Sequence, residues 1–264
     1  MKSQSLLFPL LALLCCVVFV GCTQEEPRVA EQPTKSVAAK VPAKPSMPVG
    51  ALFRPEFETI HGTVSAGTAF VIQLPGDSRP ILLSALHLLG PDGGLSERIK
   101  PTDVGEAVSK ICLTGMFEDK RTFEFDAEAI VIPDAASIGV VTKYGDVIAF
   151  KVPKDIDVTP LKCAAVEPER GESVWLYAEV LGGASKSQKL HRARVINVFD
   201  GDLLAGLVNE KTDLRATSGS VLVNSKGEAV AIHLGGGIGE DFYYCAGNPI
   251  SRFRELLEQA LADD

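Results

Sequence analysis

The 264-residue sequence predicts an all-β fold, built from antiparallel sheets closed as barrels or sandwiches. From Thr63 onward the apolar residues come in short runs rich in β-formers and separated by Gly, Pro and Asp. No strand–helix–strand alternation is visible, which argues against a doubly wound α/β fold. The composition is 46% hydrophobic and 23% charged, so wholesale disorder is excluded. The expected strands are residues 68–74, 80–84, 107–116, 122–132, 147–152, 173–180, 193–199 and 220–223.

The first 21 residues have the pattern of an export signal. Lys2 precedes an apolar run over residues 6–20, which is short for a membrane span and typical of a signal-peptide core. The run ends in Phe19-Val20-Gly21-Cys22, which resembles a bacterial lipobox. The resemblance implies removal of residues 1–21, lipidation of Cys22, and a lipid anchor on the exported side of a bacterial cell envelope. An ordinary cleaved signal and a short membrane anchor are the alternatives.

Residues 22–50 are expected to form a tether. They contain no aromatic residue, and they carry five prolines among Glu, Lys, Ala and Thr. Such a segment cannot bury enough apolar surface to offset its ordering entropy, and its prolines keep it extended. We therefore expect the folded body to span residues 51–264.

Charge and cysteine content exclude several classes of partner. The formal net charge of −8 argues against a nucleic-acid partner and against a polybasic membrane-surface binder. Of the six cysteines, only Cys112, Cys163 and Cys245 lie beyond the signal and the lipobox, and no CxxC or HExxH spacing occurs. The sequence thus predicts no metal and no cofactor, and at most one disulfide within the domain. It does not define the oligomeric state.

One long helix is expected at the C-terminus, over residues 249–262. Asn248-Pro249 has the pattern of a cap followed by proline at the first helical position. Apolar residues then recur at helical spacing, so one face of the helix packs on the body: Ile250, Phe253, Leu256, Leu257 and Leu261.

The first candidate catalytic residue is His87. It ends the apolar run Ile81-Leu82-Leu83-Ser84-Ala85-Leu86-His87, and upstream lies Gly67-Thr68-Ala69-Phe70-Val71. Together these segments resemble the G-T-A-F-V and L-S-A-x-H signature of chymotrypsin-fold serine proteases. In that family the first hairpin packs behind the catalytic histidine.

The second candidate is Ser218, in Ala216-Thr217-Ser218-Gly219-Ser220-Val221. This segment resembles the nucleophile loop G-x-S-G-[GS]-P of the same family, and two apolar strands around the turn at residues 224–227 follow it. The resemblance makes the N–H groups of Ala216 and Ser218 the oxyanion donors. Ala216 departs from the usual glycine, and Val221 departs from the usual proline.

The resemblance implies a catalytic triad whose third member is an acid between the histidine and the serine in the sequence. Asp146 stands at the head of the run Val147-Ile148-Ala149-Phe150, which resembles the D-[IVL]-A-[IVL] motif with the alanine one place late. Asp134 is the alternative. A serine hydroxyl becomes a nucleophile when an imidazole takes its proton, and the carboxylate fixes the tautomer of that imidazole.

The resemblance covers about residues 63–262. It implies two antiparallel β-barrels of the chymotrypsin type, over about 51–155 and 156–247, followed by the C-terminal helix. The implied function is a membrane-tethered serine endopeptidase acting on a protein or peptide substrate. A catalytically inactive homologue that binds peptides or partner proteins in the same cleft is the alternative, favoured by Ala216. An unrelated β-barrel carrier lipoprotein is the third possibility.

The predicted substrate-binding residues are His233, Gly235, Gly236 and Asp213. The segment Ile232-His233-Leu234-Gly235-Gly236 resembles the I-H-x-G-G strand of glutamyl endopeptidases, in which the histidine binds the glutamate before the scissile bond. A core histidine on a buried strand is the alternative reading. Asp213, five residues before Ser218, favours Lys or Arg in the pocket instead, unless Thr212 takes the pocket-facing place.

Overall fold

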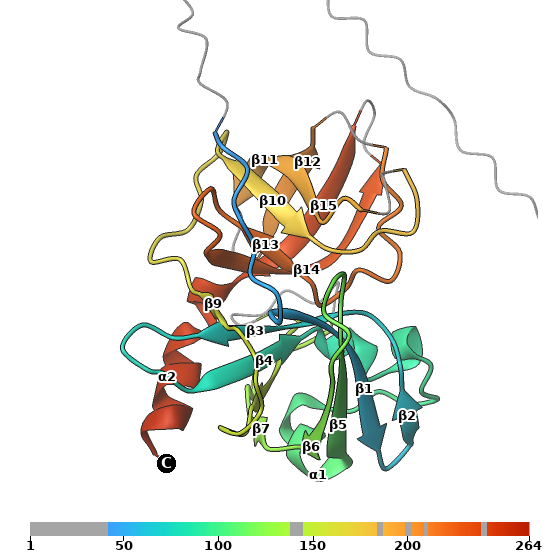
Figure 1. Cartoon of the computed structure of the whole chain (residues 1–264). Coiled ribbons are helices and arrows are strands. Elements are labelled where there is room, and N and C mark those ends of the chain that lie inside the picture. The colour runs from blue at the N-terminus through green and yellow to red at the C-terminus, as the bar shows by residue number, and fades with distance from the viewer. Residues whose placement is uncertain are drawn as a thin grey trace, which may run out of the picture. The chain divides into compact units, whose positions relative to one another are not determined.

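The computed structural model describes residues 42–137, 145–183, 187–198, 202–208, 211–238 and 242–263. All of these residues belong to one compact unit, and the expected signal peptide and Cys22 lie outside them. The unit contains two mainly antiparallel sheets, one in each half of the chain (Figure 1). The all-β architecture expected from the sequence is therefore confirmed.

The N-terminal sheet has nine strands among the described residues, in the order β6-β5-β1-β3-β4-β8-β7, with β2 paired to β1 and β9 paired to β3. It curves into a half-barrel whose described strands do not close. Its strands are β1 (Leu52–Thr59), β2 (Gly62–Val64), β3 (Ala69–Gln73), β4 (Pro80–Ser84), β5 (Val108–Gly115), β6 (Thr122–Asp126), β7 (Ala129–Ile130), β8 (Ile148–Lys151) and β9 (Leu161–Lys162). One-turn helices follow β4, at Leu86–Leu88, Pro91–Gly93 and Pro101–Asp103, and a short α1 (Val104–Ala107) precedes β5.

The C-terminal barrel is closed through the order β10-β11-β12-β15-β14-β13. Its strands are β10 (Ser173–Tyr177), β11 (Leu190–Val198), β12 (Leu203–Leu207), β13 (Val221–Val223), β14 (Ala229–Ile238) and β15 (Tyr243–Pro249). Closure gives every strand of this barrel a partner on both sides over at least part of its length.

Strand β10 shows how one strand serves two cores. Val174 and Leu176 lie in the interior of the C-terminal barrel, while Trp175 and Tyr177 join the core of the N-terminal sheet. Successive side chains of a strand point to opposite faces, so β10 buries both faces. The ring of Phe117 stacks on Tyr177, with centroids 5.6 Å apart, which adds an aromatic contact between the two halves.

The observed strands match the expected runs, with three differences. The run expected over 122–132 is divided into β6 and β7. Five strands were not expected: Pro55 interrupts β1, β2 and β9 are only three and two residues long, and β12 and β15 are rich in small residues. Strand β14 continues through Gly235–Gly237 to Ile238 rather than ending near His233.

The C-terminal helix begins later than expected. A one-turn helix at Ile250–Arg252 precedes α2 (Arg254–Ala262), and Phe253 is the N-cap of α2. The expected cap by Asn248 is wrong, because Asn248 and Pro249 belong to β15. The helix packs against the N-terminal sheet (Figure 1), and Phe253, Leu257 and Leu261 lie in that core as the periodicity predicted.

Residues 42–50, expected as part of the tether, are described and lie against the body. Pro45 is buried, and Ser46 and Met47 approach Gly227. Thr159 donates its N–H to Gly50 O at 2.8 Å, so the segment joins the N-terminal sheet before β1 begins. None of the helices in the described ranges is long and apolar enough to cross a membrane.

The three cysteines of the body are free thiols. Burial raises the pKa of Cys163 and of Cys245 to about 12, so both remain protonated and unreactive at neutral pH.

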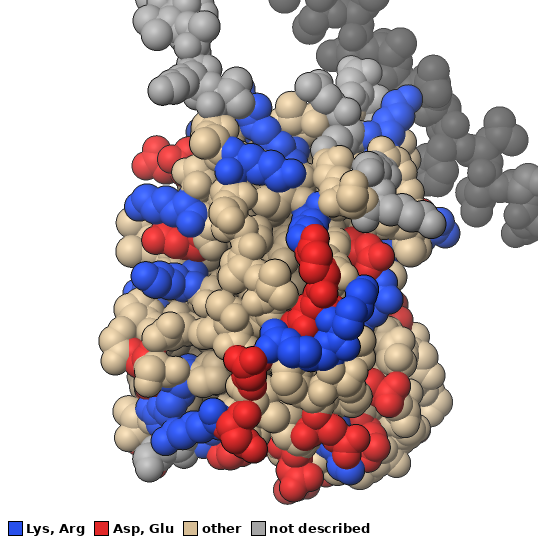
Figure 2. Space-filling view, in the orientation of Figure 1, with Lys and Arg blue, Asp and Glu red and all other residues tan. Residues whose placement is uncertain are grey.

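On the face shown in Figure 2, basic and acidic side chains are interspersed. Ion pairs of Arg54 with Glu179 and of Lys189 with Glu118 join the N-terminal sheet to the C-terminal barrel.

Candidate active site

The ends of two paired strands bring His87 and Asp146 together. Strands β4 and β8 are antiparallel, and Ser84 is paired with Ile148. His87 follows β4 in the helical turn Leu86–Leu88, and Asp146 lies two residues before β8 begins, so both lie at the same end of this strand pair. Asp134, the alternative acid, is exposed.

Asp146 holds His87 by two hydrogen bonds. Nδ1 of the imidazole lies 2.6 Å from Oδ2, and the backbone N–H of His87 donates to Oδ1 at 2.8 Å. Both residues are buried, at 5% and 2% exposure, so water competes little for these bonds. Because a carboxylate accepts and does not donate, Nδ1 carries the proton and Nε2 is the basic nitrogen.

The loop that carries Ser218 is fixed to the N-terminal sheet by close backbone contacts. Thr68 donates its N–H to Ser218 O at 2.8 Å, and Ser84 Oγ donates to Thr68 O at 2.8 Å. Gly67 and Gly219 have positive φ angles of +70° and +84°. A Cβ at Gly67 would lie 2.7 Å from Ser218 O, and one at Gly219 would collide with Thr68 O. The glycines of both sequence motifs therefore allow this contact.

Two backbone N–H groups of the same loop have no partner among the described residues. The N–H groups of Arg215, Thr217, Gly219 and Ser220 all donate within the protein, whereas within the described residues those of Ala216 and Ser218 donate to nothing. Both residues also line two adjoining pockets at the surface of the molecule. Two neighbouring free donors next to a hydroxyl form a site that can bind an oxyanion.

Ala216 adopts the left-handed conformation, with φ at +63°. This region costs an L-residue with a Cβ roughly 1–2 kcal/mol, whereas glycine enters it freely. The position thus has the backbone conformation suited to the glycine that the family usually places there.

Ser218 Oγ donates to Leu234 O at 2.7 Å, and no bond from it to His87 occurs among the described residues. Leu234 is the extra residue of a β-bulge, because His233 and Gly235 pair with consecutive residues of β15. The bulge aims the Leu234 carbonyl at the serine. His87 and Ser218 nevertheless line the same hollow.

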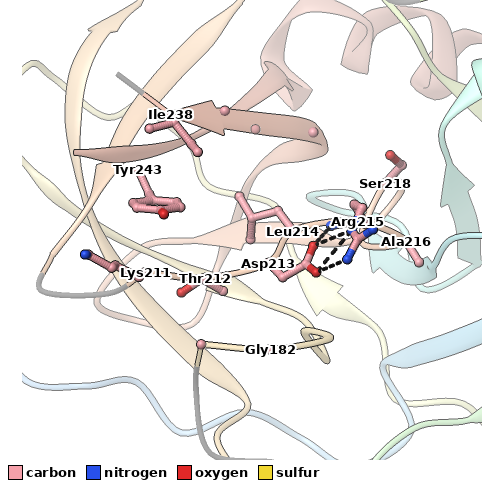
Figure 3. Close-up of a pocket in the computed structure, with 14 residues that line it drawn as sticks. Gly182, Lys211, Thr212, Asp213, Leu214, Arg215, Ala216, Ser218, Ile238 and Tyr243 are labelled. Carbon is pink, nitrogen blue, oxygen red and sulfur yellow. Dashed lines mark hydrogen bonds and ion pairs between the residues drawn. The ribbon is translucent and has the colours of Figure 1, made fainter. Parts of the chain in front are cut away.

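A pocket of about 660 Å³ opens beside Ser218 and contains three of the predicted substrate-binding residues, Asp213, Gly235 and Gly236. Figure 3 shows Ser218 and Ala216 at one end, with Lys211 and Tyr243 at the other. Arg215 forms a two-pronged ion pair with Asp213, with bonds of 2.6–3.1 Å, and holds the pKa of that carboxyl at about 2. The negative charge of Asp213 is therefore already paired.

A second hollow of about 690 Å³ lies on the other side of the nucleophile. Its lining includes His87, Leu88, Arg54, Asp92 and Leu181. Ala216 and Ser218 line both hollows, so an extended chain bound across the serine has space on each side.

The structure does not place His233 in the pocket. Its side chain is fully buried, and Nε2 lies 2.9 Å from Thr217 Oγ1, whose hydroxyl donates to Leu214 O at 2.6 Å. Because a carbonyl only accepts, the hydroxyl proton lies toward Leu214 and Nε2–H donates to Thr217. Burial lowers the pKa of His233 to about 3, so the ring is neutral. The burial of its side chain is inconsistent with the expected contact with a substrate carboxylate. His233 instead supports Thr217, the residue next to Ser218.

Asn248 is a residue of the site that sequence reasoning missed. Its Oδ1 accepts the N–H of Asp146 at 2.7 Å, and its side chain is buried. The local sequence signal, Asn before Pro, is the signal of a helix cap. Nothing in the sequence places it beside an acid 102 residues earlier.

The comparisons with known proteins agree with this architecture. No protein-family model matches the chain. A curated relative, a pro-apoptotic serine protease of the yeast Debaryomyces hansenii, is 25% identical over 204 residues, covering 76% of this chain and 19% of the relative. The chain therefore spans about a fifth of the length of the curated relative it matches.

Among solved structures, the serine endoprotease of Yersinia pestis aligns with a TM-score of 0.51 and 13% identity, covering 81% of this chain and 64% of that chain. The serine protease of a human pathogenic astrovirus aligns at a TM-score of 0.46 and 16% identity, covering 80% and 96%. The half-barrel, the closed six-stranded barrel and the first of these likenesses together show that the chain has the fold of chymotrypsin-type serine proteases.

Proposed function

We propose that the chain is a serine endopeptidase with His87, Asp146 and Ser218 as its catalytic triad. The observation that carries the proposal is the arrangement around Ser218. A carboxylate-bound imidazole lines the same hollow as Ser218, and the backbone N–H groups of Ala216 and Ser218 are unpaired within the described residues. Nucleophile, base and oxyanion donors are the parts that acyl transfer requires.

The mechanism begins with a rotation of Ser218. Its hydroxyl leaves Leu234 O and turns toward Nε2 of His87, which takes the proton as the oxygen attacks the substrate carbonyl. Asp146 stabilises the imidazolium through Nδ1–H. The N–H groups of Ala216 and Ser218 receive the developing oxyanion, and one such donor contributes about 3 kcal/mol. Water then releases the acyl group by the same steps.

The two hollows support cleavage within a chain rather than at its end. His87 must protonate the leaving amine, and His87 lines the second hollow, so the leaving segment occupies that side. The acyl side then lies in the pocket of Asp213. The edge of β14 beyond His233 is not paired with β13, so Gly235 and Gly236 leave room for a substrate strand to add there.

The pocket favours an acidic side chain before the scissile bond, with Lys211 rather than His233 as the determinant. Arg215 already pairs with Asp213, whereas the Lys211 ammonium lies at the end of the pocket away from Ser218 (Figure 3). A Lys211→Met variant is expected to lose about tenfold of the preference for glutamate over glutamine. Unchanged preference, or selectivity for Lys and Arg that disappears in Asp213→Ser, would reject this assignment.

A catalytically inactive binding module is the alternative, and the bond from Ser218 to Leu234 O favours it, since a hydroxyl held there is not activated. Labelling with a fluorophosphonate separates the two functions. The endopeptidase reacts, and its Ser218→Ala variant does not. Ser225→Ala, a serine in the turn after β13, is the matched control. Absence of labelling in the wild-type protein, combined with retained peptide binding, would favour the binding module.

For location, we propose a lipid anchor at Cys22 in a bacterial cell envelope, supported by the lipobox-like residues and the proline-rich segment that follows. Cys22→Ser should release the protein from membranes. Retention of that variant in the membrane pellet after a carbonate wash would point to another anchor.

A further inference from the structure

We infer that Asn248 and Asp202 position the catalytic acid, through a hydrogen-bonded chain that runs from Asp202 to His87. This inference rests on the proposed function, because it gives a role to Asp146 in catalysis. Neither Asn248 nor Asp202 is among the residues that line the two hollows, so both are positioning residues rather than catalytic ones.

The orientation of the Asn248 amide follows from its two partners. Nδ2 donates to Asp202 Oδ1 at 2.8 Å, and Oδ1 accepts the N–H of Asp146 at 2.7 Å. A carboxylate only accepts and a backbone N–H only donates, so the reversed amide would lose both bonds. The charge of Asp202 thereby fixes which atom Asn248 presents to Asp146.

The backbone around Asp146 is shaped for this contact. Gly145 has φ at +75°, and a Cβ there would collide with the Asn248 amide. Asn248 is 3% exposed and lies on β15 of the C-terminal barrel, opposite Ile232 of β14. The chain of bonds thus holds an acid of the N-terminal sheet at a fixed place relative to the barrel that carries Ser218. A small displacement of Asp146 moves His87, because two bonds join these residues.

Replacement of Asn248 by Ala tests the role in catalysis. We expect kcat to fall about 10- to 100-fold with KM changed less than about threefold, because the binding hollows do not include Asn248. Asn224→Ala is the matched control. Its amide also bridges a backbone N–H and a carboxylate, at the Asn224–Glu228 turn, remote from the site. A loss of kcat no greater than in that control would overturn the inference.

Exchange of the two side chains separates positioning from simple folding. Asn248→Asp alone places two carboxylates against each other and should lower kcat. The double variant Asn248→Asp with Asp202→Asn restores a donor facing an acceptor, and Asp146 N–H keeps its acceptor. We expect the double variant to regain at least tenfold in kcat over Asn248→Asp. A double variant as inactive as the single one would overturn the inference.

The same exchange distinguishes failure of the inference from failure of the proposed function. If the wild-type protein neither cleaves peptides nor reacts with a fluorophosphonate, the proposed function fails. The thermal unfolding midpoint then tests the bond chain alone. Recovery of the midpoint in the double variant relative to Asn248→Asp supports the chain, and additive effects of the two substitutions reject it.

Discussion

The N-terminal sheet and the C-terminal barrel both contribute to the candidate site, and they differ in whether the groups that they contribute are already hydrogen-bonded to one another. The N-terminal sheet presents an acid and a base that are already bonded, buried and held by strand ends. The C-terminal barrel presents a nucleophile loop with unpaired donors, a residue in the left-handed conformation, and a serine bonded to Leu234 rather than to His87.

Under the proposed function, the difference indicates which part of the chemistry is prepared before substrate arrives. The acid–base pair needs no movement, because its tautomer and orientation are fixed by Asp146. The nucleophile needs one rotation about the Ser218 side chain. Within the candidate site, the strained residue Ala216 and the open donors thus lie in the loop that carries Ser218. The loop itself is still anchored, since Thr68 and His233 bind its backbone.

The largest expected effect comes from removing one catalytic group from either half. Ser218→Ala and His87→Ala should each lower kcat/KM about 10⁴- to 10⁶-fold, because neither group acts without the other. The double variant should lose little more. Peptide hydrolysis measures the effect, with the exposed His61→Ala as a control. Multiplicative losses in the double variant would show that the two groups act separately.

The next largest effect is expected at the close contact between Gly219 and Thr68, which joins the C-terminal barrel to the N-terminal sheet. Gly219→Ala adds a Cβ that collides with Thr68 O at a φ of +84°, and should lower the free energy of unfolding by about 3 kcal/mol. Gly76→Ala is the matched control: its φ is +80°, and nothing lies within 4 Å. It should cost only about 1 kcal/mol. Denaturant unfolding measures both variants. If both lose the same free energy of unfolding, the close approach of Gly219 to Thr68 contributes nothing to stability.

Measurement of the free energy of unfolding as a function of pH tests the role of His233, which supports the loop that carries Ser218. His233 has a pKa of about 3 in the folded protein, so between that value and the ordinary range of histidine only the unfolded chain binds the proton. The free energy of unfolding should therefore fall as pH is lowered, by about 1.4 kcal/mol per pH unit from this residue. His233→Gln keeps a donor for Thr217 without titrating, and should remove that slope. His61→Gln should leave it intact.

The smallest effect concerns Ala216. Ala216→Gly relieves roughly 1 kcal/mol of backbone strain, and the greater freedom of glycine in the unfolded chain offsets most of it. Stability should change by less than about 1 kcal/mol, and kcat/KM should stay within about threefold. A large gain in activity would show that the alanine holds the loop in an inactive state.

Much of the fold could be predicted because strand periodicity is local. The run at 80–84 coincides with β4, and the apolar face of the last helix is the one that packs. Strand β1 was not predicted, because Pro55 breaks its alternating pattern, although Pro55 pairs with Leu113 in the sheet. The left-handed glycines of the two motifs were visible in the sequence, and the contacts that require them were not.

The candidate site likewise contains residues that local motifs predict and residues whose roles depend on contacts between distant parts of the chain. His87, Asp146 and Ser218 were predicted as the triad from local motifs, and the structure places His87 and Asp146 in contact. His233 was predicted to bind substrate, and its burial depends on how β14 packs against the loop, which no local pattern encodes. Asn248 was misread because its partners, Asp146 and Asp202, come from two other parts of the chain.

The open N-terminal sheet also affects how the protein behaves when it is crowded. Its described outer strands β6 and β7 expose backbone groups to which a strand of another molecule can pair and so start aggregation. Strand β7 is only two residues long. Strand β6 carries Glu124 and Asp126 among its exposed residues, so identical edges brought together repel each other. These charges protect the less closed half of the fold at high local concentration.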